Sequence, residues 1–210
     1  MEPQWSHSLR QSQLKNACLS FAQCLYIATQ GPEGAHLSQV QFRGFTEEGV
    51  VVYVDLRSRL GRDLSGTSGC EVMWSFPLTN EVYKFTFPQV QIVQEGLIYE
   101  TAWASLRPRE KAGYVSLPPD TYADEVPVFS HDLDSFTPQT QTVASPNFAL
   151  LLVAPVLVDH TRYIDKAAIG NTRKNYESLM QPEIQPQRWE HRLQGEVWVT
   201  RRLNAPHPGP

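Results

Sequence analysis

The sequence predicts a mainly β protein, an antiparallel barrel or sandwich with helices packed on its outside. Apolar residues recur at every second position over short segments, at Val40 and Phe42 and again at Val50, Val52 and Val54, and this spacing is typical of strands. Short turns separate such segments, as in the Thr-Glu-Glu-Gly run at residues 46–49. Helical periodicity is confined to a few stretches between the strands. Together these features favour a sheet that is closed or folded on itself and covered by helices.

The elements follow in order along the chain. A helix is predicted over residues 6–21, where leucines recur at helical spacing and Ser6 can act as the N-cap. A second helix is predicted from Ser58 to about residue 65, and a third over residues 97–112 until Pro108 interrupts it. The predicted strands are residues 24–29, 37–44, 50–55, 71–76, 81–93 and 148–158, and a terminal hairpin of residues 188–193 and 196–202.

Composition and length set the domain organisation. We expect one domain over residues 1–210, because two independent domains would each be small. The stretch from about residue 118 to 146 is rich in proline and polar residues and predicts a long loop. The tail at about residues 205–210 is expected to be mobile.

Charge and cysteine content limit the classes of partner. A net charge of −4 gives no general field for nucleic acid, and the absence of an 18-residue apolar run argues against a membrane span. Charged residues make up 19% of the chain, which is low and suggests surface buried against a partner subunit. Cys18, Cys24 and Cys70 have no paired spacing, so buried free thiols are expected. The expected location is the cytoplasm, with the nucleus as an alternative, because no signal pattern opens the chain.

A candidate anion site lies at the start of the second predicted helix. Ser58 suits an N-cap, and Arg59 and Arg62 place two guanidinium groups near the first helical turn. Helix N-termini with adjacent arginines bind phosphate groups well. The alternative interpretation, a surface helix with solvated arginines, is common enough that spacing alone favours it.

The same region carries a family resemblance. Arg43-Gly44-Phe45, a strand ending near Tyr53, and Ser58-Arg59 before a helix are similar to the pyridoxamine 5′-phosphate oxidase-like flavoproteins, especially their divergent cyanobacterial, plant and fungal branch. Further motifs agree in the same order over most of the chain. They are Pro3-Gln4-Trp5, Met73-Trp74-Ser75-Phe76-Pro77, Arg107-Pro108, Pro146-Asn147-Phe148, Val158-Asp159-His160 and Arg202-Leu203-Asn204.

This resemblance implies a split β-barrel, a homodimer with flavin sites at the subunit interface, and FMN as the cofactor. It implies that Arg107 contacts the substrate. The residues that it assigns to the cofactor are Ser38, Arg43, Tyr53, Val54, Ser58, Arg59 and Arg173.

Several family positions hold different residues here. Ser38 stands where the family has an arginine on the flavin phosphate, Leu60 replaces a lysine, and Val82 replaces a flavin-contacting glutamine. Pro118-Pro119 replaces a Gln-Ser pair, and Glu110 lies near the position of a phosphate-binding serine. Because charge-assisted contacts are the strong ones, we do not expect turnover of pyridoxamine 5′-phosphate.

The sequence therefore predicts an FMN-dependent oxidoreductase whose substrate and catalytic residues it does not identify. One alternative is a homodimeric split barrel that has lost FMN and acts as a binding or scaffold protein. Another is haem or a different flavin-like ligand in the same cleft. The six histidines show no metal-ligand spacing, so no metal site is expected. His160, beside Asp159, fits a structural hydrogen-bonded histidine better than a general base.

Overall fold

A computed structural model describes residues 3–46, 49–66, 69–115, 119, 142–165 and 184–204 of the protein. Most of the predicted loop over residues 118–146, the predicted mobile tail and Arg173 lie outside these described residues. Contacts between Cα atoms divide the chain into two compact units. Unit 1 consists of Met1–Tyr26, Glu71–Thr86 and Pro155–Pro210, and unit 2 consists of Ile27–Cys70 and Phe87–Ala154.

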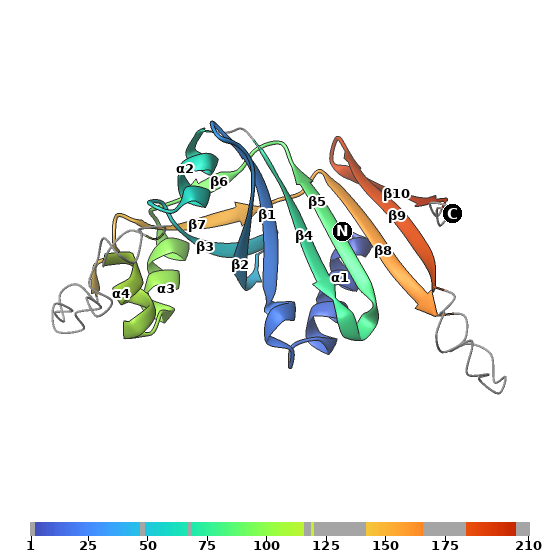
Figure 1. Ribbon diagram of the computed structural model, residues 1–210, viewed down its shortest axis with the longest axis horizontal. Coiled ribbons are helices and arrows are strands. Elements are labelled where there is room, and N and C mark those ends of the chain that lie inside the picture. Colours follow the sequence, from blue (N-terminus) through green and yellow to red (C-terminus); the bar gives the residue numbers. More distant parts are fainter. Residues whose placement is uncertain are drawn as a thin grey trace. The chain divides into compact units, whose positions relative to one another are not determined.

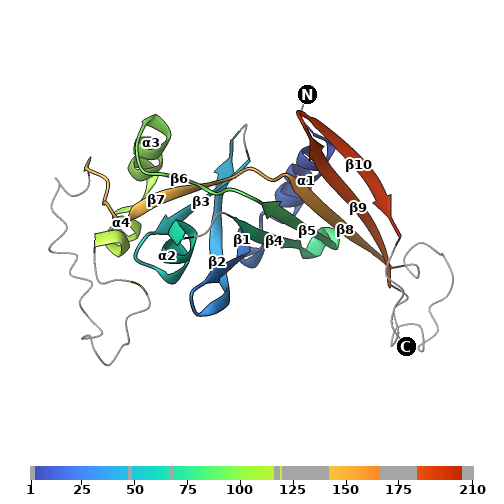
Figure 2. The ribbon, with the colours of Figure 1, turned by 90° about the horizontal axis from the view of Figure 1, so that it is seen from above.

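Unit 1 is an antiparallel sheet with a helix on one face. Its strands lie in the order β4, β5, β8, β9, β10, and Figure 2 shows β8, β9 and β10 side by side. Its elements are α1 (Gln4–Lys15), the 3-10 turn η1 (Ser20–Gln23), β4 (Cys70–Phe76), η2 (Pro77–Thr79), β5 (Glu81–Phe87), β8 (Leu157–Asp165), β9 (Ile184–Gln194) and β10 (Val197–Leu203). The predicted terminal hairpin is confirmed as β9 and β10, which turn at Gly195 with φ at 62°.

Helix α1 lies beside the sheet of unit 1 (Figure 1). It makes an aromatic contact with the sheet and a polar contact with η2. The Trp5 ring meets Phe85 of β5 at 6.0 Å and Trp198 of β10 at 5.2 Å between centroids. At the other end, the Asn16 side chain donates to the Ser12 carbonyl and accepts from the Leu78 N–H, each at 2.8 Å. The prediction of a helix over residues 6–21 is wrong at both ends, because α1 starts after Pro3 and Asn16 ends it by satisfying backbone groups with its side chain.

Unit 2 contains antiparallel strands with helices beside them. The strand order is β2, β3, β7, β6, and β1 (Cys24–Gly31) begins in unit 1 and continues into unit 2. The other elements are β2 (Gly34–Phe45), β3 (Val50–Asp55), α2 (Arg59–Gly66), β6 (Gln91–Val93), α3 (Leu97–Ser105), α4 (Pro108–Val115) and β7 (Phe148–Val153).

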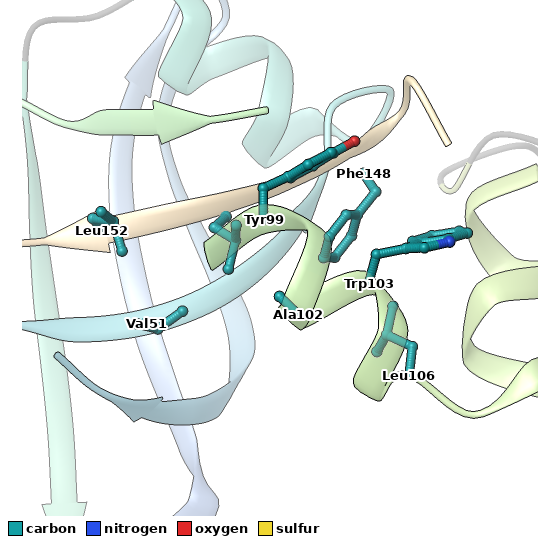
Figure 3. Packing of buried hydrophobic residues seen from close by; sticks show 8 residues of the cluster. Val51, Tyr99, Ala102, Trp103, Leu106, Phe148 and Leu152 are labelled. Atoms are coloured by element: carbon teal, nitrogen blue, oxygen red, sulfur yellow. The ribbon is translucent and has the colours of Figure 1, made fainter. Parts of the chain in front are cut away.

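The core of unit 2 is a cluster of rings around Phe148. Figure 3 shows Tyr99, Ala102 and Trp103 of α3, and Leu106 just after it, in one cluster with Phe148. All of these side chains are buried, and Phe148 is fully buried. Its ring lies within 5.5 Å of four other rings, measured between centroids: Tyr53, Tyr99, Trp103 and Tyr114. Aromatic packing of this kind holds α3 and α4 against β7.

Proline ends two strands earlier than the alternation pattern predicts. The strand predicted over residues 81–93 is divided into β5 and β6 at Pro88, and the one over residues 148–158 is divided into β7 and β8 at Pro155. Proline lacks the N–H that a sheet ladder needs, which accounts for both breaks. The predicted interruption at Pro108 is confirmed, because α3 ends at Ser105 and α4 begins at Pro108.

The three cysteines are free, as predicted. The prediction that they are buried holds only for Cys70, since Cys18 is exposed and Cys24 is half-buried. The described part of the chain contains no helix long and apolar enough to cross a membrane, and its His, Cys, Asp and Glu side chains form no cluster suited to a metal ion.

Candidate functional site

The turn from β3 into α2 is closed by Ser58. Its Oγ donates to the carbonyl of Asp55 at 2.6 Å and accepts from the N–H of Gly61 at 3.1 Å, so Ser58 caps α2 as predicted. Gly61 allows this close approach, because a Cβ there would lie 2.5 Å from the Asp55 carbonyl oxygen and from the Leu56 Cα. The first turn of α2 therefore follows directly from the end of β3.

A small cavity lies beside this first turn. Its volume is about 230 Å³, and it is lined by Pro32, Glu33, Arg59, Arg62 and Asp63. The Arg59 guanidinium is 3.4 Å from the carboxylate of Glu33, whose side chain is 81% exposed. An ion pair this open to water contributes little to the stability of the protein, so Arg59 can exchange Glu33 for another anion at a small cost in free energy. Both predicted arginines thus line one cavity, together with two acids.

Asp63 is the buried acid of this cavity. Its carboxylate accepts a hydrogen bond from Thr29 Oγ1 at 2.9 Å and lies 3.7 Å from His36 Nδ1. Gly31 makes room for it, because a Cβ at that position would lie 2.4 Å from the Asp63 Oδ1. Ser38 stands 3.4 Å from the same His36 nitrogen. Ser38, at the position where the family has an arginine, therefore lies next to the His36 ring, which already faces Asp63.

Arg43 belongs to a second group of polar side chains in unit 2. It lies where the β2–β3 register shifts between Phe42 and Gly44, and such irregularities redirect a side chain. Its guanidinium lies over the Tyr53 ring, 4.9 Å from the centroid, and donates to Glu110 at 3.1 Å. Glu110 also accepts from the Arg107 Nε at 3.0 Å. The carboxylate of Glu110 thus bridges the cofactor candidate Arg43 and the substrate candidate Arg107.

These contacts shift two pKa values. Burial raises the pKa of Glu110, but hydrogen bonds from Arg107 and Arg43 outweigh it and hold that pKa below its usual value. Burial raises the pKa of the Tyr114 phenol to about 12, with Arg43 opposing and the Asp55 carboxylate adding to the rise. Tyr114 therefore stays neutral at physiological pH, and Glu110 stays ionised.

The remaining predicted positions have plainer surroundings. Val54 is buried and pairs with Ala149 across β3 and β7. Leu60, at the family's lysine position, is buried as well, so α2 turns an apolar side chain inward there. Val82 pairs with Thr161 in the sheet of unit 1. Arg173 lies outside the described residues.

Sequence reasoning missed the role of Glu110 as the partner of both arginines. Its spacing to Arg107 is a local signal, since residues three apart on a helix are neighbours, but Arg43 is distant in the chain. It also missed Arg57, which donates to the Asp55 carboxylate at 2.7 Å and to the Gly113 carbonyl at 3.1 Å. Arg57 thereby joins the end of β3 to α4.

Comparison with solved structures identifies the fold. The chain matches a pyridoxamine 5′-phosphate oxidase-related, FMN-binding protein of Nostoc punctiforme PCC 73102 with a TM-score of 0.75 and 20% identity, covering 97% of this chain and 99% of that one. The chain has the split-barrel fold of the oxidase-like proteins. It also matches PhzG of Burkholderia lata 383, solved with tetrahydrophenazine-1-carboxylic acid, with a TM-score of 0.66 and 17% identity over 95% of this chain and 89% of that one. No protein-family model and no curated protein matches the chain.

The oxidase-like fold confirms the resemblance and the fold class predicted from the sequence. It does so over nearly the whole length of both chains. Identities of 20% and 17% carry the fold and not the site residues. The assignment of Arg43, Ser58 and Arg59 to a cofactor therefore depends on the chemistry of those side chains.

Proposed function

We propose that the protein is an FMN-binding flavoprotein of the oxidase-like fold and acts as an oxidoreductase on a small-molecule substrate. The observation that carries this proposal is the cavity beside the first turn of α2, which Arg59 and Arg62 line just after the Ser58 cap. A phosphate fits such donors, because helix N–H groups and guanidinium groups both favour an anion.

The proposed phosphate donors are Arg59, the first turn of α2 and, after local rearrangement, Ser58 and Arg43. The Ser58 hydroxyl is used twice within its own turn, so it would donate to phosphate only by releasing the Asp55 carbonyl. Arg43 would have to release Glu110. Tyr53 lies under Arg43 and would line the site, whereas Val54 offers backbone groups alone.

Bound flavin would supply the redox chemistry, as cofactors do in such enzymes. The protein's own side chains would hold and orient the phosphate. Arg107, exposed at the start of α4, is the proposed substrate contact. The free cysteines suit a reducing compartment, so we propose the cytoplasm, or the nucleus, as the site of action.

Replacing Arg59 tests whether it binds the FMN phosphate. Arg59→Ala is expected to weaken FMN binding by about 1.5–3 kcal/mol, the usual value of a hydrogen bond to a charged group. Riboflavin lacks the phosphate, so its affinity should hardly change. The measurement is a fluorescence titration of flavin-free protein with FMN and with riboflavin.

Arg201→Ala is the matched control for this titration. It removes the same charge from an exposed position in β10, and it should leave FMN affinity unaltered. Equal losses for FMN and riboflavin in Arg59→Ala would show that Arg59 does not hold the phosphate. Absence of saturable FMN binding below about 100 μM in the wild type would contradict the flavoprotein proposal, because about 5.5 kcal/mol is too weak for a retained cofactor.

A second variant tests whether Glu110 competes with the FMN phosphate for Arg43. Glu110→Gln removes the charge that pairs with Arg43 and Arg107 while keeping the size of the side chain. We expect FMN to bind more tightly, about three- to tenfold, because the freed guanidinium can turn to the phosphate. The same titration measures it, and a loss of affinity would place Glu110 among groups that support the site.

The bridge through Glu110 also favours a second candidate function. Two of the predicted cations already share one carboxylate, and Ser38 supplies no charge. A split barrel with this arrangement could serve as a binding or scaffold protein without FMN. The wild-type FMN titration separates the two functions.

We further propose a homodimer, in keeping with the chain's low content of charged residues, 19%. A stable dimer buries more than roughly 1,000 Å² between its subunits. Light scattering at micromolar concentration should give twice the chain mass of 23.8 kDa. A monomer under these conditions would remove the flavin site shared between subunits.

A further inference from the structure

A larger cavity lies within unit 1, on the face of the sheet that α1 covers. Its volume is about 290 Å³. It shares no residue with the site proposed for the FMN phosphate. Its lining comes from α1, β5, β8, β9 and β10: Gln4, Ser8, Glu81, His160, Arg162, Trp189, His191 and Thr200.

Sheet register places flat rings in a row along this face. Tyr83 pairs with His160 between β5 and β8, and His160 pairs with Trp189 between β8 and β9. The Tyr83 and His160 rings are 4.2 Å apart and inclined by only 7°. The His160 and Trp189 rings are 5.0 Å apart at 30°. Tyr83 and Trp189 therefore cover the two faces of the His160 ring, and Trp189, which lines the cavity, is the ring of this row that can stack on another flat ring.

The charged groups of this cavity contact one another within the protein. The Glu81 carboxylate is buried, lies 3.2 Å from His160 Nε2 and accepts a hydrogen bond from Ser12 Oγ. Because a carboxylate only accepts, His160 Nε2 carries a proton toward it. The Arg162 guanidinium completes the group, with its Nε 3.9 Å from the Glu81 carboxylate. The Arg162 side chain is 53% exposed, so a ligand anion that reached it would gain only a contact weakened by solvent.

His191 supplies the unused hydrogen-bonding group. It is 4% exposed, and its Nδ1 is 2.8 Å from Thr200 Oγ1. Its Nε2 is buried without a hydrogen-bond partner among the described residues. Burial lowers the pKa of His191 to about 4, with the neighbouring His160 adding to the effect and Asp159 opposing it, so the ring is neutral at physiological pH. A buried polar atom without a partner is unfavourable and gains from a ligand that pairs with it.

We propose that this cavity binds a neutral, planar heteroaromatic molecule of about one ring, whose edge both donates and accepts hydrogen bonds. Neutrality follows because the buried Glu81 carboxylate repels an anion while the exposed Arg162 returns little, and because a cation would have to displace the hydrogen bonds that Glu81 already accepts. Planarity follows from Trp189, the ring at the end of this row. An edge that both donates and accepts hydrogen bonds follows from the side chains of the lining, because the Gln4 amide, the Ser8 hydroxyl and the His191 imidazole can each act as donor or acceptor. The volume of about 290 Å³ is just below the range of typical ligand pockets, about 300–1,000 Å³, which suits a ligand of one ring.

Calorimetric titration of the full chain with nicotinamide tests this site. Nicotinamide is a neutral flat ring with an amide edge, and we expect saturable binding with a Kd of about 1 mM, as suits so small a ligand. Nicotinate carries a negative charge and should bind at least about tenfold more weakly. Cyclohexanecarboxamide keeps the neutral amide but is not flat, and it should be weakened to a similar degree.

A variant on α1 locates the binding. Ser8→Phe should fill the cavity from the helix side and weaken nicotinamide binding at least about tenfold, whereas His7→Phe adds the same ring at an exposed neighbouring position that does not line the cavity. NMR titration of the wild type should move the His191 ring resonances, which requires no variant. Equal binding of nicotinate, no effect of Ser8→Phe on a folded protein, unmoved His191 resonances or no saturation by about 20 mM would each overturn the proposal. A failed FMN titration leaves it intact, since the two sites share no residue.

Discussion

Acidification from pH 7 to pH 4 is expected to lower the free energy of unfolding by about 3 kcal/mol through His191 alone. Its pKa is about 4 in the folded protein against 6.5 for an ordinary histidine, because burial and the nearby His160 disfavour its charge. Between these values the unfolded chain takes up a proton that the folded chain does not bind. The contribution of His191 to the free energy of unfolding is therefore fully present above pH 6.5 and is lost as the pH falls through 4.

Glu81 adds a second acid-sensitive step. Burial raises its pKa, but hydrogen bonds from His160 and Ser12 and the charge of His160 outweigh this and hold it at about 2, below the ordinary 4.5. The sign is the same, because the unfolded chain is again protonated first. The stabilisation by Glu81 is present above pH 4.5 and is lost as the pH falls through 2. His191 and Glu81 lie on one face of the sheet, and both make unit 1 less stable as the pH falls. The effect of His191 comes first, and that of Glu81 follows at lower pH.

Urea unfolding at a series of pH values measures both steps. Tryptophan fluorescence is suitable, since Trp5, Trp74, Trp189 and Trp198 belong to unit 1. His191→Gln should remove most of the pH dependence between 6.5 and 4. The control His7→Gln, at an exposed position on α1, should retain it. A flat stability profile for the wild type over that range would show that His191 keeps an ordinary pKa.

Local patterns account for the elements that sequence reasoning predicted well. The valine-rich run over residues 50–55 forms β3 as predicted, and Ser58 caps α2 through atoms three residues away or fewer. Prolines at 88 and 155 are visible in the sequence, yet the apolar runs around them favoured longer strands. Asn16 ends α1 through a contact with Leu78, which no local pattern could reveal.

The polar partners could not be predicted, because they join distant parts of the chain. Sequence reasoning placed an acid next to His160 in the form of Asp159. Neighbours on a strand point to opposite faces, so Asp159 pairs with Arg188 on one face while His160 meets Glu81 on the other. The link between Arg43 and Glu110 is of the same kind, since it depends on how α4 packs beside β2 and β3.

Phe148→Ala is expected to lower the free energy of unfolding by about 3–5 kcal/mol, which is a large part of the total stability of a typical domain. Phe148 is fully buried at the start of β7 and touches the rings of Tyr53, Tyr99, Trp103 and Tyr114. Its removal takes away the ring that all four share and leaves a cavity that those side chains cannot fill without moving. Urea unfolding followed by circular dichroism measures the loss.

Two further variants define what the loss means. Phe148→Leu keeps an apolar side chain and should cost clearly less than alanine, because most of the volume is retained. Leu97→Ala removes an apolar side chain from the same unit at a position that is 81% exposed, and it should change stability by no more than about 0.5 kcal/mol. If Phe148→Ala cost less than about 1 kcal/mol, the ring cluster would not be what holds α3 and α4 against β7. The Arg43–Glu110 contact would then need another support, since Glu110 is carried by α4.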